Sequence, residues 1–138
     1  MTQEDKDLLL KDLCGRVPYR VKCKYDDRLI VNTLSVDFFW EKIEGYERYV
    51  NCTRKYDIEN IKPYLFPLSS MNEEQKKTLK VMCDWNDEEA DAQSILVLYQ
   101  KHFVMKSDVI DWLHKNHFDY RGLIPMGLAE DATDKNIY

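Results

Sequence analysis

The chain has 138 residues, of which 44% are hydrophobic and 12% aromatic, and its formal net charge is -5. This length is typical of a single domain and is sufficient for a hydrophobic core without structural disulfides or metals. The negative charge gives no general electrostatic reason to bind nucleic acid. No apolar run reaches the roughly 18 residues of a transmembrane helix, so we expect no membrane contact.

The start of the chain and its cysteines indicate the cellular compartment. The opening sequence, MTQEDKDLLL, is acidic and lacks the apolar centre of a secretory signal peptide. The four cysteines are widely spaced and contain no CxxC pair: Cys14, Cys23, Cys52 and Cys83. We therefore predict reduced, mostly buried thiols and a cytoplasmic location, with two disulfides in a secreted chain as the alternative.

Residues 1–15 are predicted to form a helix. Thr2 is a suitable N-cap, and Leu9 and Leu13 belong to an apolar stripe at helical spacing. Gly15 is expected to end the helix as its C′ residue, and Pro18 prevents the helix from resuming.

Residues 17–66 are predicted to be rich in strands. Apolar and basic residues alternate through YRVKCKY (19–25), which indicates a half-buried strand. Its outer face would carry Arg20, Lys22 and Lys24. The runs 30–38 and 46–53 predict two further strands of the same meander.

A helical turn over residues 57–60 and a short strand over 61–65 complete this part. We place that strand at a sheet edge because Pro63 and Pro67 cannot donate backbone hydrogen bonds. Three meandering strands, a helical turn and a closing strand are similar to a small SH3-like barrel.

Residues 68–138 are predicted to be mainly helical. Ser70 with Glu73 forms a possible capping box, and Ser69 could cap the same helix instead. The apolar run 94–105 is interpreted as a strand, and a final helix is expected over 107–116.

The predicted fold class is α+β. We expect a small antiparallel SH3-like β-barrel or sheet, one N-terminal helix (1–15), and C-terminal helices packed against the sheet. The β-rich part (17–66) and the mainly helical part (68–138) together make a single domain over residues 1–138.

The chain contains few residue patterns that support metal or cofactor binding. The acidic run 84–91 lacks the glycine of a calcium-binding loop, and His114 and His117 lack the further ligands of a zinc site. There is no GxSxG motif and no glycine-rich phosphate loop. We therefore predict no metal, no cofactor and no catalytic residue. An enzyme with dispersed catalytic residues is the third functional option.

The basic strand face raises the possibility of nucleic-acid binding. Arg20, Lys22 and Lys24 could contact successive phosphates. Tyr19 and Tyr25 are expected on the opposite face, where they could not stack on bases beside those contacts. We interpret the face as solvated and keep a nucleic-acid-binding regulator as the alternative function.

The stretch NHFDYRGLIPMGLAEDAT (116–133) has two interpretations. In the first, it closes the core: Asp119 caps a short helix that begins at Tyr120, and Arg121 pairs with a carboxylate. In the second, His117, Asp119, Tyr120 and Arg121 form a polar patch for a protein partner, because tyrosine and arginine are frequent interface anchors.

Three blocks of the sequence carry a resemblance: EDKDLLLKDLCGRVPYRVKC (4–23), KPYLFPLSSMNEEQ (62–75) and DWLHKNHFDYRGLIPMGLAEDATDKNIY (111–138). They resemble a family of proteins of unknown function from gut Bacteroidales genomes and their phages or prophages. In that family Thr is usual at the position of Asn72, and Glu at that of Pro125. Because proline disfavours the interior of a helix, Pro125 favours a short turn there.

The resemblance implies a mobile-element context and no particular chemistry. Accessory proteins of this size in phages often bind host proteins. Our leading hypothesis is therefore a non-enzymatic protein that binds a host or phage protein, whose identity the sequence does not give.

Overall fold

The structure is a computed structural model that describes residues 1–25, 31–33, 58–86, 89–102 and 105–138. Its four described α-helices are α1 (Gln3–Arg16), α4 (Glu73–Met82), α5 (Ala92–His102) and α6 (Ser107–Lys115). Its described strands are β1 (Lys22–Tyr25), β2 (Val31–Thr33), β3 (Ile61–Pro67), β4 (Phe118–Asp119) and β5 (Glu130–Asp131). The predicted α+β class is confirmed.

The strands form a mixed sheet in the order β2-β1-β3-β4, and β5 also pairs with β3. β1 is antiparallel to β2 and β3, whereas β4 and β5 run parallel to β3. The prediction of an antiparallel sheet is therefore wrong for the C-terminal strands. The described strands form an open sheet rather than a closed barrel. The predicted strand 46–53, and the predicted strand 30–38 beyond β2, lie outside the described residues.

β3 is the central strand, so its predicted place at an edge is wrong. β1 pairs with residues Ile61 to Pro63, and the two parallel strands pair with residues 64–67. Phe66 N donates to His117 O (2.8 Å), and Leu65 O accepts from Ala132 N (2.8 Å). Each proline removes only one backbone donor, and pairing on both sides compensates for that loss.

Helix α1 begins as predicted and ends later. Thr2 and Asp5 form a reciprocal capping box at its N-terminus. The helix continues through Gly15 and is followed by a 3-10 turn (Val17–Tyr19), so the assignment of Gly15 as C′ is wrong. Arg20 is in the left-handed region (φ 59°), and β1 therefore begins only at Lys22 rather than at residue 19.

The start of α4 differs from the predicted Ser70–Glu73 box. Asn72 is the N-cap: its side chain accepts from Gln75 N (2.8 Å), and Gln75 Oε1 accepts from Asn72 N (3.0 Å). Residues Leu68–Ser70 instead form a 3-10 turn in which Ser70 Oγ donates to Pro67 O. That turn ends before the helix begins, so neither Ser69 nor Ser70 can cap it.

The apolar run predicted as a strand is helix α5. Its buried residues recur at helical spacing: Ala92, Ile95, Leu96 and Tyr99. The Asp91 carboxylate accepts from Ser94 N (2.7 Å) and caps the helix. The final predicted helix is confirmed as α6, whose N-cap is Lys106.

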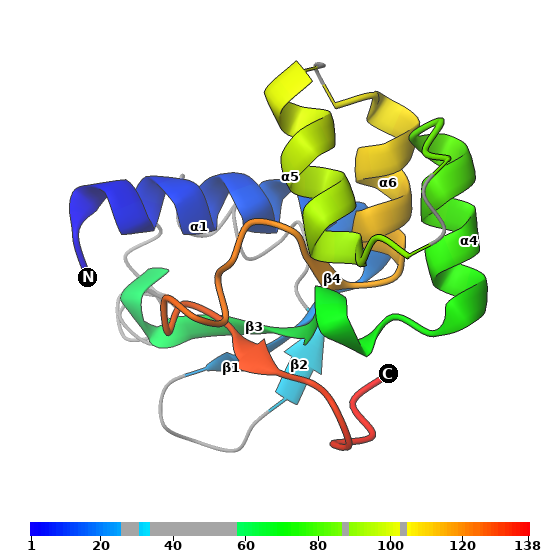
Figure 1. The fold of residues 1–138 in the computed structure, drawn as a ribbon. Helices are drawn as coiled ribbons and strands as arrows, with labels where there is room; N and C mark the ends of the chain where they lie inside the picture. Colours follow the sequence, from blue (N-terminus) through cyan, green and yellow to red (C-terminus); the bar gives the residue numbers. More distant parts are fainter. Residues whose placement is uncertain (26–30, 34–57, 87–88, 103–104) are drawn as a thin grey trace, which may run out of the picture.

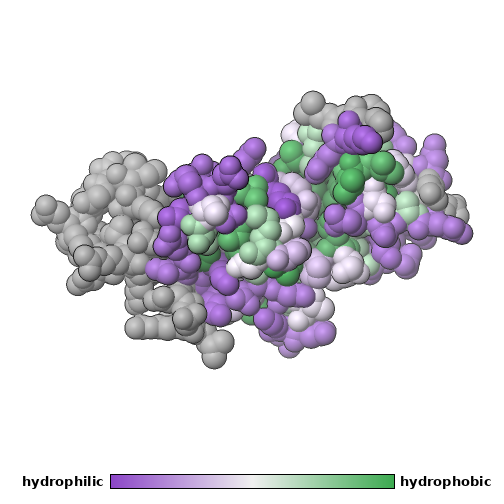
Figure 2. All heavy atoms as spheres, turned by 60° about the vertical axis from the view of Figure 1, so that its left-hand side comes forward, coloured by the Kyte–Doolittle hydropathy of each residue, from purple (hydrophilic) through white to green (hydrophobic). Residues whose placement is uncertain are grey.

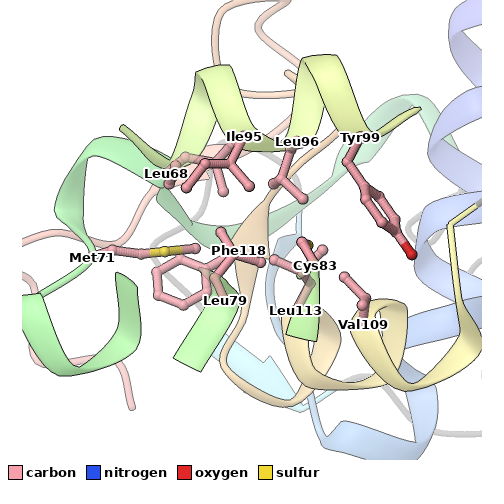
Figure 3. Packing of buried hydrophobic residues seen from close by; sticks show 11 residues of the cluster. Leu68, Met71, Leu79, Cys83, Ile95, Leu96, Tyr99, Val109, Leu113 and Phe118 are labelled. Atoms are coloured by element: carbon pink, nitrogen blue, oxygen red, sulfur yellow. The ribbon is translucent and has the colours of Figure 1, made fainter. Parts of the chain in front are cut away.

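The hydrophobic core has two clusters. The first joins α1 to β1, β3 and the 123–129 turn, and its members are Leu9, Leu13, Val21, Cys23, Ile61, Leu65, Leu123, Leu128 and Ala129. The second lies among α4, α5 and α6, with Phe118 inserted from β4 (Figure 3). Figure 1 shows α1 beside the sheet and the other three helices grouped together beyond its end.

The described cysteines carry free thiols. Cys23 and Cys83 are buried as predicted, whereas Cys14 is exposed. Burial raises the pKa of the Cys23 thiol, which keeps it protonated and unreactive at neutral pH. Of the helices in the described ranges, none combines the length and the hydropathy needed to cross a membrane.

Candidate functional site

A buried ion pair connects helix α1 to the 116–133 stretch. Asp12 and Arg16 lie one helical turn apart, and both side chains are 0% exposed. Arg16 Nε donates to Asp12 Oδ2 (2.6 Å), and Arg16 Nη2 donates to Phe118 O (2.7 Å), a residue 102 positions away in the chain. The guanidinium therefore ties the N-terminal helix to strand β4.

Arg121 extends this network from the other side. Its Nε lies 3.2 Å from Asp12 Oδ1 and donates to the Tyr120 hydroxyl at 3.0 Å. Its guanidinium carbon lies 4.9 Å from the centroid of the Tyr120 ring. The expectation that Arg121 pairs with a carboxylate is confirmed, and the carboxylate is Asp12.

His114 completes the network from helix α6. The Tyr120 hydroxyl lies 2.9 Å from His114 Nε2. Because this hydroxyl accepts from Arg121, its own proton is free to be donated to a neutral imidazole. Burial, reinforced by the nearby Arg16 charge, lowers the pKa of His114 to about 4, so the ring is neutral at physiological pH and accepts this bond.

The network explains why a glycine is found inside helix α1. A methyl group at Gly15 would lie 2.6 Å from Cε1 of His114, which is far inside van der Waals contact. The missing side chain lets α6 approach α1 closely enough for His114 to reach Tyr120. Gly15 is thus required by packing between helices and not by the end of a helix.

Asp119 organises the turn that follows β4. Its two carboxylate oxygens accept from Leu123 N and Ile124 N, both at 2.8 Å. No helix begins at Tyr120 in this part of the chain, so the predicted role of Asp119 as a helix cap is wrong. The carboxylate instead holds a turn in which Gly122 adopts φ +74°, a conformation suited to glycine.

His117 points away from this network. Its backbone is in the left-handed region (φ 59°), and its ring stacks on Tyr138 with centroids 3.7 Å apart and planes inclined by 12°. Burial, with the charges of Arg16 and Lys22, lowers the pKa of His117 to about 4. This second histidine is therefore also neutral in the folded protein.

Two cavities lie on either side of the stretch. We call the first the α5 groove; its volume is about 550 Å³, and it is lined by Pro67, Leu68, Ser69, Lys76, Asp91, Ala92, Gln93, Asp119, Gly122, Ile124 and Pro125. The second has a volume of about 470 Å³ and is lined by Phe66, Ser70, Gln75, Lys115, Asn116, His117, Phe118, Thr133 and Asp134.

The four predicted patch residues do not converge on one cavity. Asp119 lines the α5 groove and His117 lines the second cavity. Tyr120 and Arg121 lie between them in the network with Asp12 and His114. The stretch contributes Phe118 to one core cluster and Leu123 to the other. We call the network of Asp12, Arg16, His114, Tyr120 and Arg121 the clasp.

The three basic residues predicted to share one strand face, Arg20, Lys22 and Lys24, lie in different surroundings. Arg20 is exposed and precedes β1, whereas the Lys22 amine donates to Ile137 O (2.6 Å). The Lys24 amine lies 3.5 Å from a carboxylate oxygen of Glu130. Nucleic-acid binding through these residues stays a prediction, and these contacts do not specifically favour it.

Sequence reasoning did not identify Asp12, Arg16 or His114 as members of the network. The signal that could have indicated the first pair is a carboxylate and a guanidinium four residues apart, next to the apolar stripe of α1. Among the described residues, no group of three or more histidine, cysteine or carboxylate side chains is arranged to hold a metal ion.

Comparisons with known proteins give no relative. No protein-family model matches the chain. No curated protein matches it, and no solved structure does. The interpretation of the candidate site therefore rests on its own geometry.

Proposed function

We propose that this protein acts by binding another protein, and that the α5 groove receives an extended segment of that partner. The observation that carries the proposal is the lining of the groove, which combines apolar residues with side chains of opposite charge. Among the lining residues, Leu68 and Ala92 are buried and Ile124 is half-buried. An apolar side chain entering the groove would displace water from these surfaces.

Two prolines and Asp119 constrain the backbone around the groove. Pro67 and Pro125 restrict the backbone on two sides, and Asp119 fixes the turn by accepting two backbone hydrogen bonds. A preorganised site loses less conformational entropy on binding. The small side chain of Ala92 leaves space at the start of α5, where a larger residue would fill the floor.

The charged rim restricts the partner's chemistry. Lys76 and Asp91 both line the groove and carry opposite charges; Lys76 also pairs with Glu73 at 3.2 Å, and Asp91 also accepts from Ser94 N at 2.7 Å. We infer a partner segment with one apolar anchor flanked by an acidic and a basic residue. The resemblance to proteins of Bacteroidales and their phages suggests a host or phage protein as its source.

The same geometry supports binding more strongly than catalysis. The histidine, tyrosine and arginine of the clasp contact one another rather than either cavity's ligand space. The one titratable residue of the stretch that lines the groove, Asp119, already accepts two backbone hydrogen bonds. Each oxygen of that carboxylate holds a backbone amide of the turn, which is a structural role.

Peptides selected from a random display library against the full chain provide the test. We expect them to contain an apolar anchor, and we expect Gln93→Arg to weaken their binding at least about tenfold, which corresponds to about 1.4 kcal/mol. Gln93 is exposed at the rim of the groove, so the substitution blocks the opening without altering the core. Isothermal titration calorimetry measures the change.

Gln100→Arg is the matched control, because Gln100 is exposed two turns further along the same helix and does not line the groove. We expect it to leave peptide affinity unchanged. Equal loss in both variants, or no loss in Gln93→Arg, would contradict the proposed binding site. Circular dichroism establishes that both variants are folded.

A further inference from the structure

Tyr138 occupies a site at the end of the sheet. Its hydroxyl accepts from Lys22 N (2.9 Å) and donates to Tyr64 O (2.8 Å), so it bridges the neighbouring strands β1 and β3. Both backbone groups are thereby satisfied by a side chain rather than by another strand. Burial raises the pKa of this hydroxyl, which keeps it protonated and able to donate.

Neighbouring side chains also contact the ring of Tyr138 and the carbonyl group of Ile137. The ring stacks on His117 at 3.7 Å and lies 5.8 Å from the Phe66 ring. The Lys22 amine lies 5.8 Å from the centroid of the Tyr138 ring and donates to Ile137 O. We call this site, formed by Lys22, Tyr64, Phe66 and His117, the tyrosine niche.

The segment that carries Tyr138 lies at the surface, and its other contacts include those of Lys135, whose backbone amide donates to Ala132 O (3.2 Å) and whose amine lies 3.9 Å from a Glu130 carboxylate oxygen. Residues 133–136 are exposed, and Tyr138 itself is 44% exposed. Asp134 (φ 61°) and Asn136 (φ 51°) adopt left-handed backbone conformations, which aspartate and asparagine tolerate better than most residues other than glycine. Segments with few buried contacts open locally at low free-energy cost.

We propose that the tyrosine niche is a second recognition site, which Tyr138 fills within the chain and which a tyrosine-bearing segment of a partner protein can take over. The residues that precede the partner's tyrosine would lie along the second cavity. That cavity is bordered by Phe66 and His117 on one side and by Thr133 and Asp134 of the displaced segment on the other. This inference is independent of the α5 groove.

The hydrogen bonds determine why the occupant is a tyrosine. A phenylalanine could stack on His117, but it would leave Lys22 N and Tyr64 O without their partners, which carries a desolvation cost. A covalently attached occupant competes at an effective concentration in the millimolar range. A free segment therefore binds measurably only when the attached tyrosine is removed or when its flanking residues add contacts.

The test is an NMR titration of the 138-residue chain with the acetylated hexapeptide TDKNIY, which repeats residues 133–138. We expect the Tyr138→Ala variant to bind this peptide at least about tenfold more tightly than the wild-type chain, because its niche is vacant. The peptide TDKNIF should bind the same variant at least about tenfold more weakly. Shifts should centre on the amides of Lys22, Phe66 and His117.

Equal affinity of wild type and Tyr138→Ala, or of the two peptides, would overturn the proposal. If Tyr138→Ala does not fold, the Tyr138→Phe variant is tested instead, because it keeps the stacking on His117 and removes only the hydroxyl. We then expect faster hydrogen exchange at the Lys22 amide, whose acceptor is lost. Unchanged exchange at that amide would equally overturn it.

Discussion

Replacing Arg16 with methionine lowers the free energy of unfolding by about 3–5 kcal/mol. The substitution leaves the Asp12 carboxylate buried without its closest cation and removes the donor to Phe118 O. Breaking a buried pair on one side costs more than the pair contributes, because the remaining charge stays desolvated. Urea denaturation at pH 7, followed by circular dichroism, measures this loss.

Two further variants distinguish this cause from a general effect of losing an arginine. Arg20→Met removes an exposed arginine four residues away and is expected to change stability by less than about 0.5 kcal/mol. Asp12→Leu combined with Arg16→Met removes both buried charges and should recover much of the loss. If the double variant is as unstable as the sum of its single variants, the ion pair is not the cause.

Acidification from pH 6.5 towards pH 4 is expected to destabilise the protein. The pKa values of His114 and His117 are lowered to about 4 in the folded state, mainly by burial. The unfolded chain therefore binds more protons within this window, and stability falls as the pH falls. Each histidine contributes up to about 1.4 kcal/mol per pH unit to the slope of the unfolding free energy against pH. Its contribution to stability is fully present above the unfolded pKa of about 6.5 and is lost as the pH falls towards the folded pKa.

The His117→Asn variant separates the two histidines. Asparagine tolerates the left-handed backbone at this position better than most residues. We expect the slope of unfolding free energy against pH to fall by about half in this variant. A slope that is unchanged, or a wild-type protein whose stability does not vary between pH 6.5 and 4, would contradict the neutral state of these rings.

Local sequence patterns were sufficient to predict the helices that depend on capping and apolar spacing within a few residues. Thr2 indicated the start of α1 through its capping interaction, and the apolar spacing after Lys106 indicated α6, because both signals act over a few residues. The run 94–105 was misassigned because its β-branched and aromatic residues favour strands. Packing of α5 against two other helices overrides that preference, and no local signal reports it.

The position of β3 depended on pairing between distant parts of the chain. Its partners come from residues 22–25 on one side of the sequence and from residues 118–131 on the other. Pro63 and Pro67 do lack backbone N–H donors, as predicted. The conclusion that β3 therefore lies at the edge of the sheet was wrong. Only the complete set of partners shows that the strand tolerates them.

In the candidate site, too, local features could be predicted from the sequence, whereas contacts between distant residues could not. The polar residues of the 116–133 stretch were recognised as unusual, and the pairing of Arg121 with a carboxylate was predicted. Which carboxylate it contacts could not be predicted, because Asp12 lies more than a hundred positions earlier in the chain. The separation of His117 from Asp119 depends on the left-handed backbone at His117, which no local motif indicated.

We propose that the clasp stabilises the fold and that partner binding occurs in the α5 groove. The most direct test measures the affinity of the selected peptide for the folded Tyr120→Phe/Arg121→Gln variant beside Gln93→Arg. We predict that the clasp variant is less stable yet binds the peptide with unchanged affinity, whereas Gln93→Arg is stable and binds at least about tenfold more weakly. The reverse, a folded clasp variant that loses the peptide while Gln93→Arg retains it, would contradict the claim.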